Sequence, residues 1–248
     1  MKKYGLIGFP LGHSFSKGFF TDKFKNENNN ECIYNNYPLE NIELLLPLIK
    51  NDTEIKGLNV TIPFKEKVLH LVDKLDEKAA QIGAVNTLKI IRTGSKFTIE
   101  GYNTDCYGFE IPLLKVLKPY HRKALILGTG GASKAVKFVL EELGIEFLFV
   151  SRNNKGKGII TYRELTNEII NNHHLIINTS PLGMFPDINS CPEIPCHAIT
   201  DRHILYDLVY NPEKTLFLTK GGQKKATLLN GLPMLHLQAE KSWEIWNL

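Results

Sequence analysis

The sequence predicts an α/β protein with mainly parallel sheets, divided into two domains. Short apolar segments of strand length alternate along the 248 residues with segments whose apolar residues recur at helical spacing. A glycine-rich turn, Gly128-Thr129-Gly130-Gly131, joins one of these strands directly to a helix. A chain of this length can bury the cores of two modest domains, and we expect the turn to belong to one of them.

The first predicted domain consists mainly of the residues before 104. Apolar segments predict strands at residues 4–7, 34–38, 57–61, 84–91 and 96–102. The last two of these strands are paired across the turn Thr93-Gly94-Ser95. Helical segments are predicted at residues 16–25, 44–49 and 68–71.

The second predicted domain contains the glycine-rich turn. Strands are predicted at residues 124–127, 146–150, 175–178 and 205–208, and helices at 107–117, 132–143 and from 231 onward. We expect one domain to comprise residues 1–103 plus 232–248 and the other residues 104–231, so that the C-terminal helix returns to the first domain.

The glycine-rich turn predicts a site for a pyrophosphate. In a strand–turn–helix unit, backbone N–H groups and the positive end of the helix dipole face whatever lies above the turn. The candidate phosphate-binding residues are Gly128, Gly130, Gly131, Ala132 and Ser133, the last in place of the third glycine of the usual G-x-G-x-x-G pattern. The following strand completes a β-α-β unit typical of Rossmann-type dinucleotide-binding domains. The alternative is a structural turn that binds no ligand.

The residues after the next strand predict which dinucleotide binds. An NAD site usually has Asp or Glu there, which accepts a hydrogen bond from the ribose 2′-hydroxyl. This chain has Ser151-Arg152-Asn153-Asn154-Lys155 instead. Arg152 and Lys155 can bind a 2′-phosphate, so NADP is favoured over NAD. The alternative is a basic loop that only faces water.

Composition argues against several other classes of protein. The net charge of +4 is small, and no basic run indicates nucleic-acid binding. We expect neither a signal peptide nor a membrane span, because no apolar segment is long enough. Cys32, Cys106, Cys191 and Cys196 match no zinc pattern, so we expect reduced thiols, no metal and a cytoplasmic location.

Four loop motifs in the first half of the chain carry polar residues at predicted strand ends. They are Gly12-His13-Ser14-Phe15-Ser16, Asn59-Val60-Thr61-Ile62-Pro63-Phe64-Lys65, Gly83-Ala84-Val85-Asn86-Thr87 and Asn103-Thr104-Asp105. Ligands of open α/β folds bind beyond the carboxyl ends of strands, so these motifs predict a small-molecule site. Taken singly, a serine or Asp105 can equally be a helix cap, and Lys65 a solvated lysine.

Together with the glycine-rich turn, these motifs closely resemble those of the shikimate dehydrogenase family. The resemblance continues, in the same order, through Asn178-Thr179-Ser180-Pro181-Leu182-Gly183-Met184, Asp207-Leu208-Val209-Tyr210-Asn211-Pro212 and Gly231-Leu232-Pro233-Met234-Leu235. It implies a substrate-binding domain, a Rossmann-type domain, and NADP-dependent interconversion of 3-dehydroshikimate and shikimate on the route through chorismate to aromatic amino acids.

The resemblance also implies roles for individual residues. Lys65 and Asp105 correspond to the catalytic pair. The residues that correspond to the shikimate-binding set are Ser14, Ser16, Thr61, Asn86, Tyr210 and Gln238. Those that correspond to the pyrophosphate and adenosine-phosphate site are Gly128, Gly130, Gly131, Ala132, Ser133, Ser151, Arg152 and Lys155. Those on the nicotinamide side are Thr179, Leu208, Gly231 and Met234.

Two positions depart from the family pattern, and two other functions stay open. Lys17 stands where the family usually has proline, and Ser151 where it often has asparagine. One alternative is a quinate/shikimate dehydrogenase that uses NAD. The other is a non-catalytic NADP-binding regulator, which would have no need of both Lys65 and Asp105. We expect a monomer or a homodimer, with no nucleic-acid or membrane partner.

Overall fold

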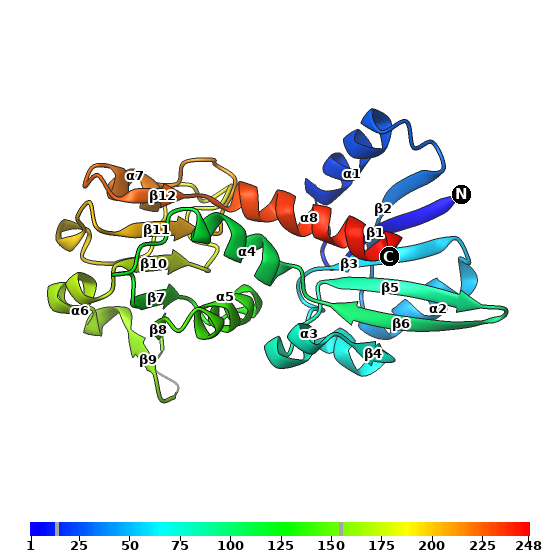
Figure 1. Cartoon of the computed structure of the whole chain (residues 1–248), viewed down its shortest axis with the longest axis horizontal. Coiled ribbons are helices and arrows are strands. Elements are labelled where there is room, and N and C mark those ends of the chain that lie inside the picture. The colour runs from blue at the N-terminus through cyan, green and yellow to red at the C-terminus, as the bar shows by residue number, and fades with distance from the viewer. Residues whose placement is uncertain (13–14, 154–155) are drawn as a thin grey trace. The chain divides into compact units, whose positions relative to one another are not determined.

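The computed structural model describes residues 1–12, 15–153 and 156–248. These residues form two compact units, each with its own six-stranded sheet (Figure 1). Unit 1 comprises Met1–Thr104 and Gln238–Leu248, and unit 2 comprises Asp105–Leu237. The predicted α/β fold class, with a C-terminal helix that returns to the first unit, is confirmed. The helix enters unit 1 at Gln238, later in the chain than the predicted crossing at residue 232.

The sheet of unit 1 is mixed. Its strands, in sheet order, are β2 (Cys32–Pro38), β1 (Lys2–Gly8), β3 (Ile55–Val60), β5 (Thr87–Thr93), β6 (Lys96–Tyr102) and β4 (Lys74–Leu75). β1 pairs in parallel with both β2 and β3, while β5 pairs antiparallel with β3 and with β6. β5 begins later than predicted, because the backbone N–H of Val85 donates to the carbonyl oxygen of Lys65 (2.7 Å) and not to a neighbouring strand.

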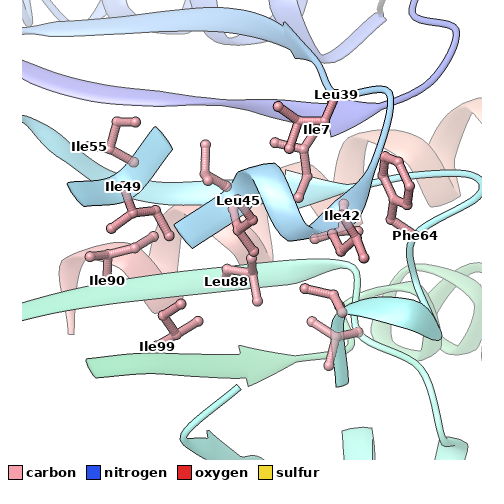
Figure 2. Packing of buried hydrophobic residues seen from close by; sticks show 14 of the residues in the cluster. Ile7, Leu39, Ile42, Leu45, Ile49, Ile55, Phe64, Leu88, Ile90 and Ile99 are labelled. Carbon is pink, nitrogen blue, oxygen red and sulfur yellow. The ribbon is translucent and has the colours of Figure 1, made fainter. Parts of the chain in front are cut away.

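Short helices pack against the strands in the first of two apolar clusters found among the described residues of unit 1. These helices are η1 (Ile42–Leu44), α2 (Leu45–Asn51), η2 (Lys67–Leu71) and α3 (Glu77–Ile82). Leu45 and Ile49 of α2 join Leu88 and Ile90 of β5 in a single buried cluster (Figure 2). Each fully buried side chain of this size stabilises the fold by roughly 1.5–3 kcal/mol, so this cluster is a main source of stability for unit 1.

The second cluster of unit 1 is aromatic and lies between β1, β2, α1 (Phe15–Asn26) and the C-terminal part of α8 (Gly231–Asn247). The Tyr4 and Trp246 rings stack with centroids 4.9 Å apart, and Phe20 stacks on Tyr34 at 4.6 Å. The Trp246 indole N–H also donates to the carbonyl oxygen of Leu88 (2.9 Å). The end of α8 is therefore part of the core of unit 1.

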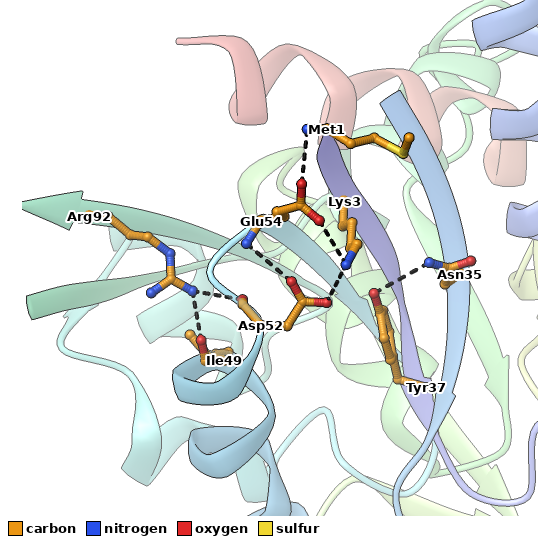
Figure 3. Close-up of polar contacts among 8 residues, drawn as sticks. All are labelled: Met1, Lys3, Asn35, Tyr37, Ile49, Asp52, Glu54 and Arg92. Atoms are coloured by element: carbon orange, nitrogen blue, oxygen red, sulfur yellow. Dashed lines mark hydrogen bonds and ion pairs between the residues drawn. The ribbon is translucent and has the colours of Figure 1, made fainter. Parts of the chain in front are cut away.

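Charged groups join the loop before β3 to its neighbours (Figure 3). The Lys3 ammonium lies 2.9 Å from carboxylate oxygens of both Asp52 and Glu54, and the chain's amino group lies 3.0 Å from Glu54. These cations hold the pKa of the Glu54 carboxyl at about 2. Arg92 of β5 donates to the carbonyl oxygens of Ile49 (2.7 Å) and Asp52 (3.0 Å), which connects the hairpin to the end of α2.

The sheet of unit 2 is entirely parallel. Its strands, in sheet order, are β12 (Thr227–Leu229), β11 (Ile204–Asp207), β10 (Leu175–Asn178), β7 (Lys123–Leu127), β8 (Glu146–Ser151) and β9 (Ile159–Thr161). The order reverses between β7 and β10, as it does in a Rossmann-type sheet, and ligands bind at such a switch point. The predicted Rossmann-type unit is confirmed.

The helices of unit 2 are α4 (Asp105–Leu114), α5 (Gly131–Glu142), η3 (Tyr162–Glu164), α6 (Asn167–Asn172), η4 (Cys196–Ala198) and α7 (Leu216–Gly222). α4 contacts α5, and α5 contacts β7 and β8, the strands that precede and follow it in the chain. Leu125, Ile176, Leu205 and Phe217 are among the buried side chains of its apolar cluster. Among the described residues, no helix is both long and apolar enough to cross a membrane.

Four histidines lie at the amino-terminal ends of the unit 2 strands. His121 precedes β7, His173 and His174 precede β10, and His203 precedes β11. The His174 and His203 rings lie 5.1 Å apart. Parallel strands begin at the same edge of a sheet, so these rings lie on the edge opposite the predicted ligand site.

Backbone groups fix two of these rings in the neutral form. His203 accepts the N–H of Thr200 at Nδ1 (3.0 Å), and its Nε2–H donates to the carbonyl oxygen of Ile170 (3.0 Å). The Nδ1 atom of His121 accepts the N–H of Lys118 (2.8 Å). A proton added at Nδ1 would face a backbone donor in place of an acceptor.

We predict that acid destabilises unit 2 through these histidines. Burial lowers the pKa of His121, His173, His174 and His203 below the ordinary value of 6.5. Below pH 6.5 the unfolded chain therefore binds more protons than the folded chain. The free energy of unfolding is highest above pH 6.5 and decreases as the pH falls below it. Asp207, whose pKa burial raises to about 6, acts in the opposite direction. Urea unfolding at about pH 7.5 and about pH 5.5 should show that the free energy of unfolding is smaller at the lower pH, by an amount on the order of 1–3 kcal/mol.

A pair of variants tests the source of this loss. His203→Asn keeps an acceptor near the position of Nδ1 but cannot be protonated, so the difference between the two pH values should shrink. His197 is exposed, and His197→Asn should leave that difference unchanged. Equal pH dependence in the wild type and His203→Asn would contradict the assignment.

Candidate active site

Asn59 is the centre of a buried polar network in unit 1. The Tyr34 hydroxyl donates to Asn59 Oδ1 (2.8 Å). Asn59 Nδ2 donates to the hydroxyl oxygens of Ser242 (2.9 Å) and Thr87 (3.2 Å). Tyr34 in turn has a side-chain hydrogen bond with Ser16, which only partly offsets the burial that raises the pKa of Tyr34. The network therefore connects α1 through β2 and β3 to α8.

Asn86 extends this network to a loop at the end of β6. Its Oδ1 atom accepts the backbone N–H of Thr104 (2.7 Å), and its Nδ2 donates to Oε1 of Gln238 (3.0 Å) and to the Thr104 hydroxyl (3.1 Å). Thr87 also donates to Asn86 Oδ1 (3.1 Å), which joins the two asparagines. Asn86 and Thr104 are buried, so these bonds are shielded from water.

Three of the residues that resemble shikimate-binding positions, Ser16, Asn86 and Gln238, thus belong to one hydrogen-bonded network. Thr61 follows β3, where its N–H donates to the carbonyl oxygen of Ile7 (2.9 Å). Lys65 is half-buried, and its carbonyl oxygen accepts the N–H of Val85 from the segment that contains Asn86. Ser14 lies outside the described residues.

The two predicted catalytic residues belong to different units. Lys65 lies in unit 1, and Asp105 is the buried first residue of α4 in unit 2. Tyr210, also predicted to bind substrate, is a half-buried residue of unit 2.

A pocket of about 320 Å³ opens at the carboxyl ends of the unit 2 strands. It is lined by residues from the glycine-rich turn, the end of β8, the start of η3 and the loop after β10: Gly128, Thr129, Gly130, Val150, Ser151, Arg152, Tyr162, Thr179, Ser180, Pro181 and Leu182. This is the switch point of the sheet, where the sequence predicted a dinucleotide.

Gly128 shapes the floor of this pocket. Its φ of +114° lies in a region that residues other than glycine rarely adopt. A Cβ atom there would also lie 2.9 Å from Oγ1 of Thr179. The Thr179 hydroxyl donates to the carbonyl oxygen of Leu127 (3.0 Å), so it cannot move away without losing that bond.

The first turn of α5 follows directly. Gly130 is the N-cap residue and has no side chain that could accept a hydrogen bond. The first N–H groups of the helix are therefore available to a ligand. Gly131 and Ala132 begin the helix. Both the N–H (3.0 Å) and the hydroxyl (2.6 Å) of the buried Ser133 donate to the carbonyl oxygen of Gly130. Ser133 therefore closes the turn with its own polar groups.

The other end of the pocket is basic. Ser151 and the exposed Arg152 line it at the end of β8, and Tyr162 lines it from η3. The Arg152 charge acts on Tyr162 and opposes the burial that raises the pKa of that hydroxyl. No acidic residue is among the described residues that line the pocket. Lys155 lies outside the described residues.

Asn178 and Asp207 fix the loop after β10, which also lines the pocket. Asn178 Oδ1 accepts the N–H (3.1 Å) and hydroxyl (2.7 Å) of Ser180, and Nδ2 donates to Asp207 Oδ1 (2.9 Å). Asp207 also accepts the Thr215 hydroxyl (2.5 Å) and the Val209 N–H (3.1 Å). Burial of Asp207 outweighs these bonds and raises its pKa to about 6.

Gly231, predicted for the nicotinamide side, lies against the backbone that follows β11. The Gly231 N–H donates to the carbonyl oxygen of Val209 (3.1 Å). A Cβ atom on Gly231 would overlap the carbonyl oxygen of Leu208, so only glycine fits at the start of α8. Met234 is buried in the first turn of that helix.

Comparison with known proteins identifies the family. Residues 6–88 match the family model of the shikimate dehydrogenase substrate binding domain. The chain is 35% identical to the shikimate dehydrogenase (NADP(+)) of Halothermothrix orenii, over 98% of this chain and 89% of that protein. The chain belongs to the shikimate dehydrogenase family. The resemblance found in the sequence is thereby confirmed.

Solved structures of the shikimate dehydrogenase family agree with this fold. A chorismate mutase/shikimate 5-dehydrogenase fusion protein from Clostridium acetobutylicum is 35% identical, with a TM-score of 0.86 over 99% of this chain and 90% of that one. The shikimate 5-dehydrogenase of Thermus thermophilus, solved in complex with NADP(H) and shikimate, is 29% identical, with a TM-score of 0.84 over 99% and 93%.

Several residues of both sites had no role predicted from the sequence. Tyr162 lines the pocket because it follows β9, a three-residue strand without a periodic signal. Ser242 lies within the predicted final helix, where no local signal marks it, yet it joins Asn59 to α8. Asn178 and Asp207 each end an apolar strand with a polar residue, and that signal could have identified them.

We predict that Gly128→Ala destabilises unit 2, whereas Gly130→Ala does not. Alanine at position 128 must adopt a positive φ and displace Thr179, at a cost of about 1–3 kcal/mol. Gly130 has a φ of −81°, and a Cβ there would meet no atom within 4 Å. Urea unfolding of both variants measures the difference, and equal stability would show that the turn is not constrained as described.

Proposed function

We propose that this chain is an NADP-dependent shikimate dehydrogenase that interconverts 3-dehydroshikimate and shikimate. The family assignment supports the activity. The observation that carries the cofactor choice is the unit 2 pocket, which has a glycine turn at one end and Arg152 at the other, with no acidic residue among its described lining residues. Unit 1 is proposed as the substrate-binding domain and unit 2 as the cofactor domain.

The residues of the unit 2 pocket fit NADP. The backbone of Gly128, Gly130, Gly131 and Ala132 would hold the pyrophosphate, because helix N–H groups and the helix dipole favour an anion there. Ser133 would contribute by fixing the turn, since its polar groups are bonded within it.

Different residues would bind the adenosine end and the nicotinamide end of NADP. Arg152, with Ser151 and Lys155, would bind the adenosine 2′-phosphate, because a guanidinium matches phosphate geometry. The residues proposed for the nicotinamide side are Thr179, Leu208, Gly231 and Met234.

The unit 1 network fits a polyhydroxylated carboxylate substrate. Hydroxyl and amide groups recognise ring hydroxyls, and a buried amide left without its partner costs about 1–3 kcal/mol, which gives selectivity. The proposed substrate contacts are Ser14, Ser16, Thr61, Asn86, Tyr210 and Gln238. Because Asn86 and Gln238 are bonded to each other, each fixes the orientation of the other's amide.

Catalysis requires hydride transfer and proton transfer at one carbon–oxygen group. NADPH, when bound, supplies the hydride. Lys65 is proposed to donate a proton to the ketone oxygen of 3-dehydroshikimate as negative charge develops there, and to accept it back in the reverse direction. Asp105 is proposed to orient the ammonium and to favour its charged form. The cytoplasmic location stays a prediction, as does the choice between monomer and homodimer.

The test is an assay of shikimate or quinate, each with NADP or NAD, that follows reduced nicotinamide by absorbance. We expect turnover mainly with shikimate and NADP. Turnover chiefly with quinate or NAD would favour a quinate/shikimate dehydrogenase. No turnover with NADP binding intact would favour a non-catalytic regulator.

The same assay tests Lys65 with a matched control. Lys65→Met should lower kcat with shikimate and NADP by about 10²–10⁴-fold, the usual contribution of a positioned acid or base. NADP binding, measured by calorimetry, should change little. Lys67 is an exposed neighbour, and Lys67→Met should retain wild-type kcat. A wild-type kcat in Lys65→Met would exclude the proton-transfer role.

A further inference from the structure

A lysine in unit 2 lies beside two cysteines that the proposed reaction does not use. Lys220 of α7 donates from Nζ to Sγ of Cys191 (3.1 Å). Its charge also acts on Cys196, which begins η4, and Cys191 and Cys196 act on each other. Both cysteines are half-buried thiols. The hydrogen bond with Cys191 raises the pKa of Lys220, so the ammonium keeps its charge.

We propose that Cys191 is a peroxide-reactive thiol, activated by Lys220 and resolved by a disulfide with Cys196. A cation beside a partly exposed thiol promotes the thiolate, which is the form that peroxides oxidise. Surface thiols without such a neighbour react far more slowly. The inference concerns these side chains alone and does not depend on the proposed function.

The chemistry balances in two steps. The Cys191 thiolate attacks one oxygen of hydrogen peroxide, the O–O bond breaks, and sulfenic acid and hydroxide form. The Cys196 sulfur then attacks the sulfenic sulfur, the S–O bond breaks, and the hydroxyl leaves as water with the Cys196 proton. Overall, two thiols are oxidised by two electrons and one peroxide is reduced.

The two cysteines differ in a way that suits this order. Burial raises the pKa of Cys196, which favours its thiol form, whereas Cys191 is the cysteine that accepts the hydrogen bond of the Lys220 ammonium. The chain between them is compact, because the N–H of Ile194 donates to the carbonyl oxygen of Pro192 (3.0 Å) and the N–H of Cys196 to that of Ile194 (2.7 Å). Both cysteines lie near enough to Lys220 to act electrostatically on its ammonium.

This segment is bonded to the wall of the unit 2 pocket. Ser190, next to Cys191, accepts the N–H of Gly183 at its hydroxyl (2.9 Å) and donates to the carbonyl oxygen of Asp187 (2.9 Å). Gly183 follows Leu182, which lines the pocket. A Cys191–Cys196 disulfide would pull on Ser190, so we expect oxidation to release the Gly183 N–H.

Site-resolved mass spectrometry of the full chain after treatment with hydrogen peroxide and dimedone tests the proposal. Cys191 should react at least about tenfold faster than the buried Cys32 and Cys106, and should end mainly in a disulfide with Cys196. Cys196→Ser should accumulate the dimedone adduct at Cys191. Reaction of Cys191 no faster than Cys32, or no disulfide with Cys196, would overturn the proposal.

Lysine variants test the activating role. Lys220→Met should slow oxidation of Cys191 by about tenfold, and Lys220→Arg, which keeps the charge, should restore much of the rate. Lys214 is exposed in the same unit, and Lys214→Met should react like the wild type. An unchanged rate in Lys220→Met would contradict the role of Lys220.

Hydrogen exchange tests the connection to the pocket wall. After peroxide treatment, the amide of Gly183 should exchange faster in the wild type and at its original rate in Cys191→Ser. Unchanged exchange in the oxidised wild type would contradict the predicted movement of this wall.

Discussion

Asn86 and Asn178 each stand where a strand meets a loop, and each is fully or almost fully buried. Asn86 Oδ1 accepts the N–H of Thr104 (2.7 Å), and Asn178 Oδ1 accepts that of Ser180 (3.1 Å). A backbone N–H left without a partner in such a place costs about 1–3 kcal/mol, so each loop is held in one conformation. Both candidate sites depend on this use of a buried amide at a strand end.

The chemistry proposed for each unit follows from what these amides hold in place. In unit 1, Asn86 orients Gln238 and the loop that leads to Asp105, while the same segment binds the backbone of Lys65 through Val85. In unit 2, Asn178 is held by a buried carboxylate, Asp207, whose raised pKa reflects the cost of burying it. That cost is acceptable only because three donors surround the carboxylate.

Much of this could be predicted from the sequence, because local pattern determines it. The strands at 124–127 and 175–178 and the glycine turn carry strong apolar and turn signals. β9 and β12 have three residues each, and neighbouring strands determine where they form. The bond between Asn59 and Ser242 joins residues far apart in the chain and has no local signal. The roles of Lys65 and Asp105 came from the family resemblance and stay predictions.

Calorimetric titration of NADP into Asn178→Leu would test whether the buried amide determines the pocket. Leucine has a similar volume but leaves the N–H and hydroxyl of Ser180 without their acceptor. We expect Kd for NADP to rise at least about tenfold, equivalent to about 1.4 kcal/mol. Asn172→Leu, at an exposed position of α6, should bind as the wild type does. Wild-type affinity in a folded Asn178→Leu protein would contradict the view that strand-end amides hold the cofactor loop.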